Sequence, residues 1–128
     1  MAIDMALDEA GPRRILLIED DAAVREMIAL ALTDEGYAVQ SAADGAAALA
    51  LIDHSPPDVI LLDMKMPVMD GWAFATQYEQ QLAARVPVIV LTAAQDAGRW
   101  AAEIGAVDYL AKPFDLEALL NVIAEHTG

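Results

Sequence analysis

Polar residues that could do chemistry follow four apolar runs of the sequence. They are an acidic pair, a single aspartate, a threonine, and a lysine with the proline after it: Glu19-Asp20, Asp63, Thr92 and Lys112-Pro113. Carboxylates, a hydroxyl and an ammonium group are the parts that phosphoryl transfer uses for positioning and for neutralising charge. Asp63 can supply the oxygen nucleophile, since carboxylates form acyl phosphates.

The three carboxylates predict a bound cation. Glu19, Asp20 and Asp63 carry like charges, and bringing such groups together at low dielectric raises their pKa values unless a cation intervenes. Oxygen ligands without His or Cys suit Mg²⁺, which keeps several waters and uses one or two carboxylates together with phosphate oxygens. The expected cofactor is therefore Mg²⁺, and the metal, Lys112 and the Thr92 hydroxyl would meet the charge of an added phosphoryl group.

The apolar runs indicate a sheet that would bring these residues together. Each run is a short stretch of apolar residues, aliphatic except for Tyr109, and such runs between turn residues are typical of buried strands in a parallel sheet: 15–18, 59–62, 88–91 and 109–110. In an open sheet of this kind, the carboxyl ends of the strands converge on one crevice, where ligands bind. Residues that are far apart in the sequence are therefore expected in a single pocket.

Helical periodicity and capping residues occupy the intervals between the strands. Helices are predicted at residues 21–34, 44–54, 70–84, 95–104 and 115–126, and a short edge strand at 37–40. Five strands alternating with five helices predict an α/β fold, a doubly wound parallel sheet in the flavodoxin-like order 2-1-3-4-5. Residues 13–126 would form this domain and residues 1–12 a flexible tail. The two histidines, His54 and His126, are expected at helix ends as surface or capping residues, not as metal ligands.

Composition and charge exclude several classes of function. The net charge is −14, from 21 acidic and 7 basic residues without a basic stripe, so nucleic-acid binding is not expected. The apolar runs are too short to span a bilayer, and the first residues are acidic where a secretion signal needs basic charge. With no cysteine for disulfides, these features predict a cytoplasmic protein without membrane contact.

Four stretches of the chain carry a family resemblance. They are ILLIEDD at 15–21, VILLDMKMPVMDG at 59–71, VIVLTA at 88–93 and GAVDYLAKPF at 105–114. In these motifs the sequence resembles the receiver domain of bacterial two-component response regulators, of the single-domain chemotaxis type. With the helices between them, the motifs cover residues 13–125, which is nearly the whole chain.

The resemblance implies a role for each residue of the acidic site. Asp63 would be the phosphoacceptor, and Asp20 would be the direct metal ligand. Glu19 would act mainly through metal-bound water, and the main-chain carbonyl of Lys65 would complete the metal shell.

The resemblance also implies which residues hold the phosphoryl group and respond to it. Thr92 and Lys112 would hold the phosphoryl oxygens. Tyr109 matches the aromatic residue whose side chain changes rotamer with phosphorylation, and the bond before Pro113 would be cis.

Two further positions concern the lifetime of the phosphoryl group. Lys65 and Ala94 match the family positions that flank the path of the attacking water. Ala94 has no polar group to orient that water, while the long Lys65 side chain could shield the phosphoryl oxygens. A slowly hydrolysed phospho-form is therefore predicted.

Together these roles predict a phospho-accepting switch and not an enzyme with an external substrate. A sensor histidine kinase or a histidine phosphotransfer protein would be the donor, and a downstream output protein would bind the switched face. Two alternatives are a docking scaffold that acts independently of phosphorylation and the receiver part of a larger response regulator or hybrid kinase. A flavodoxin-like cofactor site is rejected because Glu19-Asp20-Asp21 would repel a phosphate. A hydrolase with an Asp nucleophile would need a second Asp where Lys65 stands.

The charges of the last two helices favour a monomer. The helix at 115–126 has acidic residues and no Lys or Arg, and the helix at 95–104 offers Arg99 against Asp96 and Glu103. Two such faces related by a two-fold axis would oppose more acid than base. The face should therefore be free for a different partner. Trp100 and Ile104, four residues apart, are expected to flank the core, with one side of Trp100 exposed to that partner.

Overall fold

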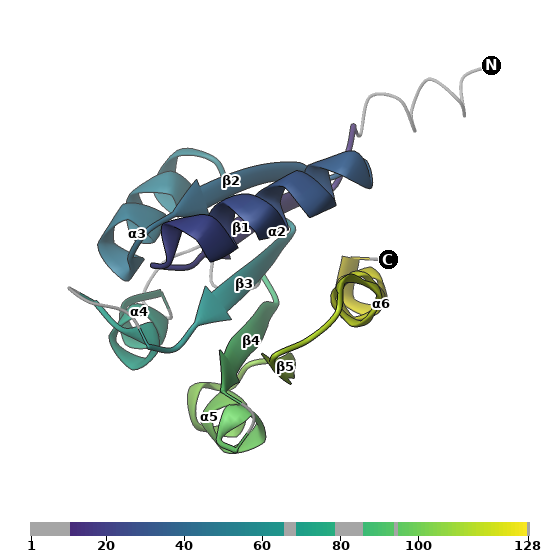
Figure 1. Cartoon of the computed structure of the whole chain (residues 1–128). Helices are drawn as coiled ribbons and strands as arrows, with labels where there is room; N and C mark the ends of the chain where they lie inside the picture. The colour runs from purple at the N-terminus through teal and green to yellow at the C-terminus, as the bar shows by residue number, and fades with distance from the viewer. Residues whose placement is uncertain (1–10, 66–68, 79–85, 94, 128) are drawn as a thin grey trace.

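The computed structural model describes residues 11–65, 69–78, 86–93 and 95–127, in which strands and helices alternate along the chain (Figure 1). The strands are β1 Arg14–Ile18, β2 Ala38–Ala42, β3 Val59–Asp63, β4 Val88–Ala93 and β5 Asp108–Lys112. The helices are α2 Ala22–Asp34, α3 Gly45–His54, α4 Gly71–Tyr78, α5 Ala97–Ile104 and α6 Leu116–Thr127. None of these described helices has the length and apolar character needed to cross a membrane.

The strands form one parallel sheet in the order β2-β1-β3-β4-β5, which confirms the predicted topology. The register pairs Ile18 with Leu62 and Asp63 with Leu91. The carboxyl ends of β1, β3 and β4 therefore lie side by side at one edge of the sheet, where the fold places ligands.

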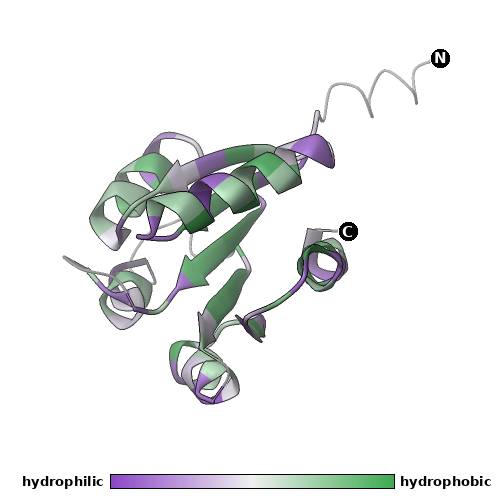
Figure 2. Ribbon diagram, in the orientation of Figure 1, coloured by the Kyte–Doolittle hydropathy of each residue, from purple (hydrophilic) through white to green (hydrophobic). Residues whose placement is uncertain are grey.

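Helices cover both faces of the sheet and enclose two apolar cores. Residues of α3, α4 and α5 contribute to one core, and residues of α2 and α6 contribute to the other. Alternate residues of β1 supply them, since Leu16 and Ile18 lie in the first core and Ile15 and Leu17 in the second. Figure 2 shows β3 and β4 as hydrophobic along most of their length, as strands buried on both faces should be.

Aspartate side chains cap the starts of α2, α3, α4 and α6. The Asp21 carboxylate accepts a hydrogen bond from the Val24 backbone N–H at 3.0 Å, which satisfies one of the free amides at the start of α2. Aspartates at the starts of α3, α4 and α6 make the same kind of bond: Asp44, Asp70 and Asp115. Because Asp21 closes the turn after β1, its cap holds Glu19 and Asp20 at the carboxyl edge of the sheet.

Several observed boundaries differ from the predicted ones. β2 occupies residues 38–42 and not 37–40, because it pairs with every residue of β1. α5 begins at Ala97 instead of residue 95. Its end at Ile104 agrees with the prediction and is capped by Gly105, whose φ of 70° is the left-handed conformation that favours glycine. The predicted continuation of α4 over residues 79–84 and most of the predicted tail, residues 1–10, lie outside the described residues.

Trp100 and Ile104 flank the core, as predicted, but Trp100 is more buried than expected. Its side chain is only 8% exposed, and its ring lies against that of Trp72, with the centroids 4.9 Å apart. Ile104, one turn further along α5, packs against the same core. The prediction that one side of Trp100 is exposed to a partner is therefore wrong, because Trp72 and the core cover it.

Candidate functional site

Three carboxylates meet at the carboxyl edge of the sheet. Glu19 and Asp20 follow β1, and Asp63 is the last residue of β3. A carboxylate oxygen from each of the three lies within 4.8 Å of the other two. Glu19 and Asp63 are 1% and 5% exposed, whereas Asp20 is exposed, so the cluster has a buried floor and an open side.

Lys112, the last residue of β5, brings a positive charge to this cluster. Its ammonium nitrogen donates a hydrogen bond to Glu19 Oε1 at 2.6 Å and lies 3.7 Å from Asp63 Oδ2. The peptide bond from Lys112 to Pro113 is cis, as the family resemblance implies. One ammonium group cannot balance three carboxylates, and the all-oxygen donor set that remains fits a hard cation such as Mg²⁺.

Burial and mutual repulsion distribute the protons of the site unevenly. Burial, together with the neighbouring Glu19 carboxylate, raises the pKa of Asp63 to about 7. Burial is the largest single influence on Glu19 and disfavours its ionised form. The bond and the charge of Lys112, together with hydrogen bonds from Asp63 and the Asp21 backbone, outweigh burial, so the pKa of Glu19 lies below its ordinary value. Without a metal, the proton therefore resides on Asp63, and a cation bound beside Asp63 would favour its ionised form.

This proton should make stability depend on pH. Between pH 3.8 and about 7 the folded protein holds a proton on Asp63 that the unfolded chain has already released. The free energy of unfolding should therefore fall as the pH rises through this window, by up to about 1.4 kcal/mol per pH unit. Urea unfolding in the presence of a chelator measures the slope.

Asp63→Asn, which cannot titrate, is the control for that slope, and saturating Mg²⁺ is a second control because it favours the ionised carboxylate. Both should remove the contribution of Asp63 to the slope of stability against pH and leave the contributions of other titrating groups unchanged. A slope in the Asp63→Asn variant equal to that of the unchanged protein would place the proton elsewhere.

The two residues of the implied switch lie on neighbouring strands. Thr92 is buried in β4, directly after Leu91, which pairs with Asp63. Tyr109 lies in β5 and is 49% exposed. Its ring rests on α5 at Gly98, where an added Cβ atom would lie 3.3 Å from the ring. Tyr109 thus occupies an outward position in this structure, beside a helix that leaves room for the ring.

Lys65 makes contacts that the sequence did not predict. Its backbone N–H donates to Asp63 Oδ1 at 3.2 Å, while its ammonium group lies 5.0 Å from the centroid of the Trp100 ring and 6.0 Å from that of Trp72. Trp72 in turn donates from Nε1 to Glu103 Oε1 at 2.9 Å. In this conformation the Lys65 side chain is directed to a cation–π contact. Shielding of a phosphoryl group on Asp63 would require it to leave the tryptophan rings.

Arg25 also supports the acidic site, although the sequence did not predict this role. Its Nη1 atom donates to the backbone carbonyls of Glu19 at 2.8 Å and Asp20 at 3.3 Å, so it fastens the acidic turn to α2. Its position in the first turns of the helix that Asp21 caps could have indicated this role. Ala94, which was predicted to flank the path of water, lies outside the described residues.

Sequence comparison relates this site to a known family. A family model described as "Response regulator receiver domain" matches residues 15–124. A response regulator MprA of a Mycobacterium species (strain KMS) is 43% identical over 111 residues, which are 85% of this chain and 48% of that protein. The MprA protein of Mycobacterium bovis (strain BCG / Pasteur 1173P2) is 42% identical over 109 residues. The chain spans about half the length of these curated relatives.

Comparison with solved structures gives the same relationship. The chemotaxis protein CheY4 of Vibrio cholerae superposes with a TM-score of 0.82 at 33% identity, covering 91% of this chain and 99% of that one. The receiver domain of NtrX from Brucella abortus superposes with a TM-score of 0.81 at 29% identity, covering 88% of this chain and 97% of that one.

Proposed function

Since this chain belongs to the response regulator receiver domain family of two-component systems, we propose that it is a cytoplasmic switch that accepts a phosphoryl group on Asp63. The donor would be the phosphohistidine of a sensor histidine kinase or of a histidine phosphotransfer protein. One observation carries the proposal: the Glu19, Asp20 and Asp63 carboxylates converge within 4.8 Å. Lys112 lies 3.7 Å from the Asp63 carboxylate.

Each side chain has a defined part in the transfer. A carboxylate oxygen of Asp63 attacks phosphorus, the P–O bond forms, and the P–N bond to the donor imidazole breaks. Lys112 and Thr92 would stabilise the charge that builds on the phosphoryl oxygens. Asp20, Asp63 and the Lys65 carbonyl would hold Mg²⁺, with Glu19 behind them. When bound, Mg²⁺ supplies positive charge that lowers the pKa of Asp63 and neutralises the phosphoryl group.

The response would run through Thr92 and Tyr109. A phosphoryl group on Asp63 would draw the Thr92 hydroxyl toward it, and Tyr109 would leave its outward position to fill the space behind Thr92. Because Tyr109 rests on α5 at Gly98, its movement would change the face formed by α5, β5 and α6. An output protein that prefers one shape of this face would then shift the equilibrium between the two shapes.

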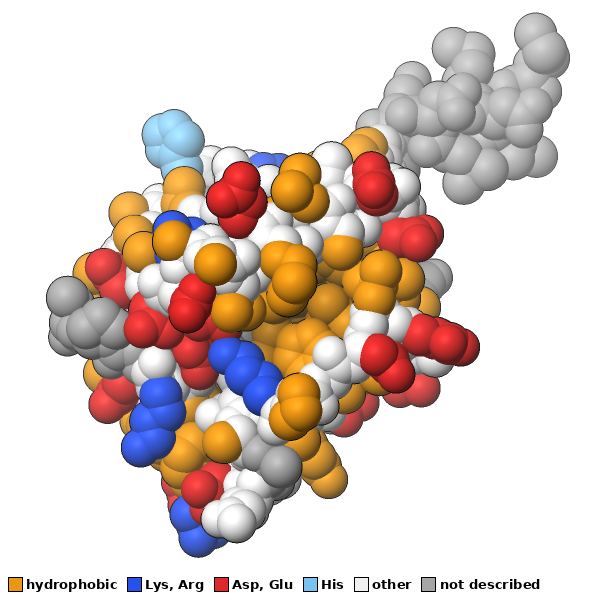
Figure 3. All heavy atoms as spheres, viewed as in Figure 1, with side chains coloured by type: hydrophobic (Ala, Val, Ile, Leu, Met, Phe, Trp, Pro, Cys, Tyr) orange, Lys and Arg blue, Asp and Glu red, His pale blue; other side chains and the backbone are white. Residues whose placement is uncertain are grey.

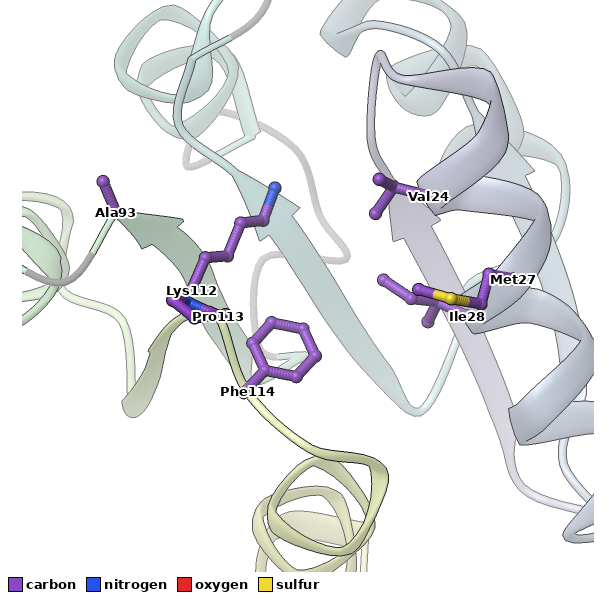
Figure 4. A pocket seen from close by; sticks show the side chains of 7 residues that line it. All are labelled: Val24, Met27, Ile28, Ala93, Lys112, Pro113 and Phe114. Atoms are coloured by element: carbon purple, nitrogen blue, oxygen red, sulfur yellow. The ribbon is translucent and has the colours of Figure 1, made fainter.

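An apolar groove beside the site is suited to a protein donor. It has a volume of about 410 Å³ and is lined by Val24, Met27, Ile28, Ala93, Lys112, Pro113 and Phe114. Figure 4 shows the α2 side chains on one side of the groove and Pro113 and Phe114 on the other, with Lys112 extending from beside Pro113 toward the sheet edge. Figure 3 shows the apolar hollow with acidic side chains around it. Because Lys112 belongs to both groove and site, a helix seated here would bring its histidine close to Asp63.

Phosphotransfer from a panel of purified histidine kinases tests the proposal. At least one kinase should transfer its phosphoryl group to the chain, and Asp63→Asn should prevent that transfer. Met27→Glu, at a groove side chain that is 63% exposed, should weaken transfer from the kinase but leave transfer from acetyl phosphate unchanged. Acceptance from neither kinases nor acetyl phosphate would favour the alternative of a scaffold that works without phosphorylation.

The lifetime of the phospho-form should depend on Lys65. We expect Lys65→Asn to speed hydrolysis of the phosphoryl group by about tenfold, which corresponds to about 1.4 kcal/mol of barrier. The reason is that a long side chain that leaves the tryptophan rings can cover the phosphoryl oxygens, whereas asparagine cannot. Decay of the phosphorylated mass after removal of the donor measures the rate. An unchanged or slower decay would rule out shielding by Lys65.

We also propose that the chain acts as a monomer and turns over no external substrate. Arg99 is already paired, at 2.7 Å, with Asp96, the residue that precedes its own helix, and α6 carries no Lys or Arg to pair across a two-fold axis. Light scattering with and without beryllofluoride and Mg²⁺ should therefore give the monomer mass in both cases. A tight activated dimer that Arg99→Glu abolishes would show that this face associates with itself.

A further inference from the structure

A second cluster of possible metal ligands lies at the opposite edge of the sheet from the acidic site. Asp108 is the first residue of β5, and Glu125 and His126 lie in the last turn of α6. One donor atom from each residue lies within 4.8 Å of the other two, and His126 Nε2 is 3.0 Å from Asp108 Oδ2. Ligands that share one metal ion are separated by distances of this order.

The surroundings of the cluster favour a cation. Within the described part of the chain, no Lys or Arg lies at ion-pair distance from Asp108 or Glu125, so His126 alone faces these carboxylates. The carboxyl end of α6 adds partial negative charge from its last carbonyl groups. A hydrogen-bonded pair of His126 and Asp108 would explain why those two side chains meet, but not why a Glu125 carboxylate oxygen also lies close to them.

The Asp108 carboxylate is also oriented for ligation. Its Oδ1 atom accepts a hydrogen bond from the Tyr109 backbone N–H at 2.8 Å, which leaves Oδ2 directed at His126. Hydrogen bonds of this kind fix the orientation of metal-binding carboxylates. No sequence pattern relates the three residues, because His126 is separated from Asp108 by the whole of α6.

We propose that Asp108, Glu125 and His126 bind a divalent transition-metal ion of the Zn²⁺ type. An imidazole nitrogen favours Zn²⁺, Ni²⁺ or Cu²⁺, whereas Mg²⁺ prefers oxygen ligands, so this site and the acidic site would select different ions. The bound ion would join the start of β5 to the end of α6, next to Tyr109. It would thereby hold together two of the elements that form the proposed output face.

Titration of the untagged protein with Zn²⁺ in excess Mg²⁺, followed by calorimetry and by the ring resonances of both histidines, tests the proposal. The His126 resonances should shift at stoichiometric Zn²⁺, while those of His54, which is exposed at the end of α3, should not. Equal shifts at both histidines, or a shift at neither, would overturn the proposal.

Three variants complete the test. His126→Asn and Glu125→Gln should each weaken Zn²⁺ binding by about 100-fold, since even residues behind a metal ligand cost about 10- to 100-fold. His54→Asn is the matched control and should leave binding unchanged. All three should still accept phosphate from acetyl phosphate, which shows that they are folded. Unchanged Zn²⁺ affinity in His126→Asn, or loss of binding in His54→Asn, would contradict the assignment.

Discussion

Asp63→Asn is expected to abolish the mass gain that acetyl phosphate and Mg²⁺ produce in the unchanged protein. Asparagine has nearly the shape of aspartate but lacks the anionic oxygen that must attack phosphorus. The fold should survive, because the variant removes a buried carboxylate that lies beside Glu19 and whose pKa is raised to about 7. Intact-protein mass spectrometry measures the gain directly.

A chelator and a second variant complete that experiment. A chelator should prevent the gain in the unchanged protein, because one ammonium group cannot balance both the carboxylates and an incoming phosphoryl group. Asp53→Asn, at an exposed aspartate of α3, is the matched control and should be phosphorylated normally. A gain that persists in Asp63→Asn or in chelator would refute the role of Asp63.

The sheet and its acidic edge could be predicted because each depends on a local pattern. The strands that became β1, β3 and β4 are runs of aliphatic residues bounded by turn residues, and both faces of such runs must be buried. Once the strands are parallel, their carboxyl ends share an edge, so the convergence of Glu19, Asp63 and Lys112 follows from topology. No contact between these side chains had to be known beforehand.

Contacts between side chains of different elements could not be predicted in this way. Trp72 and Trp100 come from separate helices, and Lys65 comes from the loop after β3, so no periodicity relates them. Their meeting depends on how α4 and α5 pack against the same face of the sheet. The mistaken exposure of Trp100 has this cause, since helical spacing shows which side of α5 is apolar but not what covers it.

The edge strand shows a similar limit. Only Ala42 of β2 is buried, so this strand does not show the alternation of buried and exposed residues that marks a half-buried strand. Its length is determined by its hydrogen bonds to β1, which pair all five residues of each strand. A boundary that depends on a neighbouring strand cannot be read from the strand's own residues.

Lys112→Met should slow phosphorylation by acetyl phosphate by about 10²- to 10³-fold, the usual cost of losing one group that stabilises transition-state charge. The ammonium group lies 3.7 Å from Asp63 Oδ2 and is one of the forces that lower the pKa of Asp63, so its removal also leaves less of the nucleophile ionised. Methionine keeps most of the volume of lysine without its charge. The rate of mass gain at saturating Mg²⁺ measures the effect.

Lys65→Met is the control, because it removes the same charge as Lys112→Met from a different position. Lys65 and Lys112 are the two lysines of the chain. The Lys65 ammonium group lies over the Trp100 ring at 5.0 Å from its centroid, so its loss should change the phosphorylation rate by only a few-fold. If both variants slowed phosphorylation equally, the rate would depend on the net charge around the site and not on the position of the Lys112 ammonium group. Slowing in Lys112→Met alone would assign the stabilising charge to the ammonium group that β5 places beside Asp63.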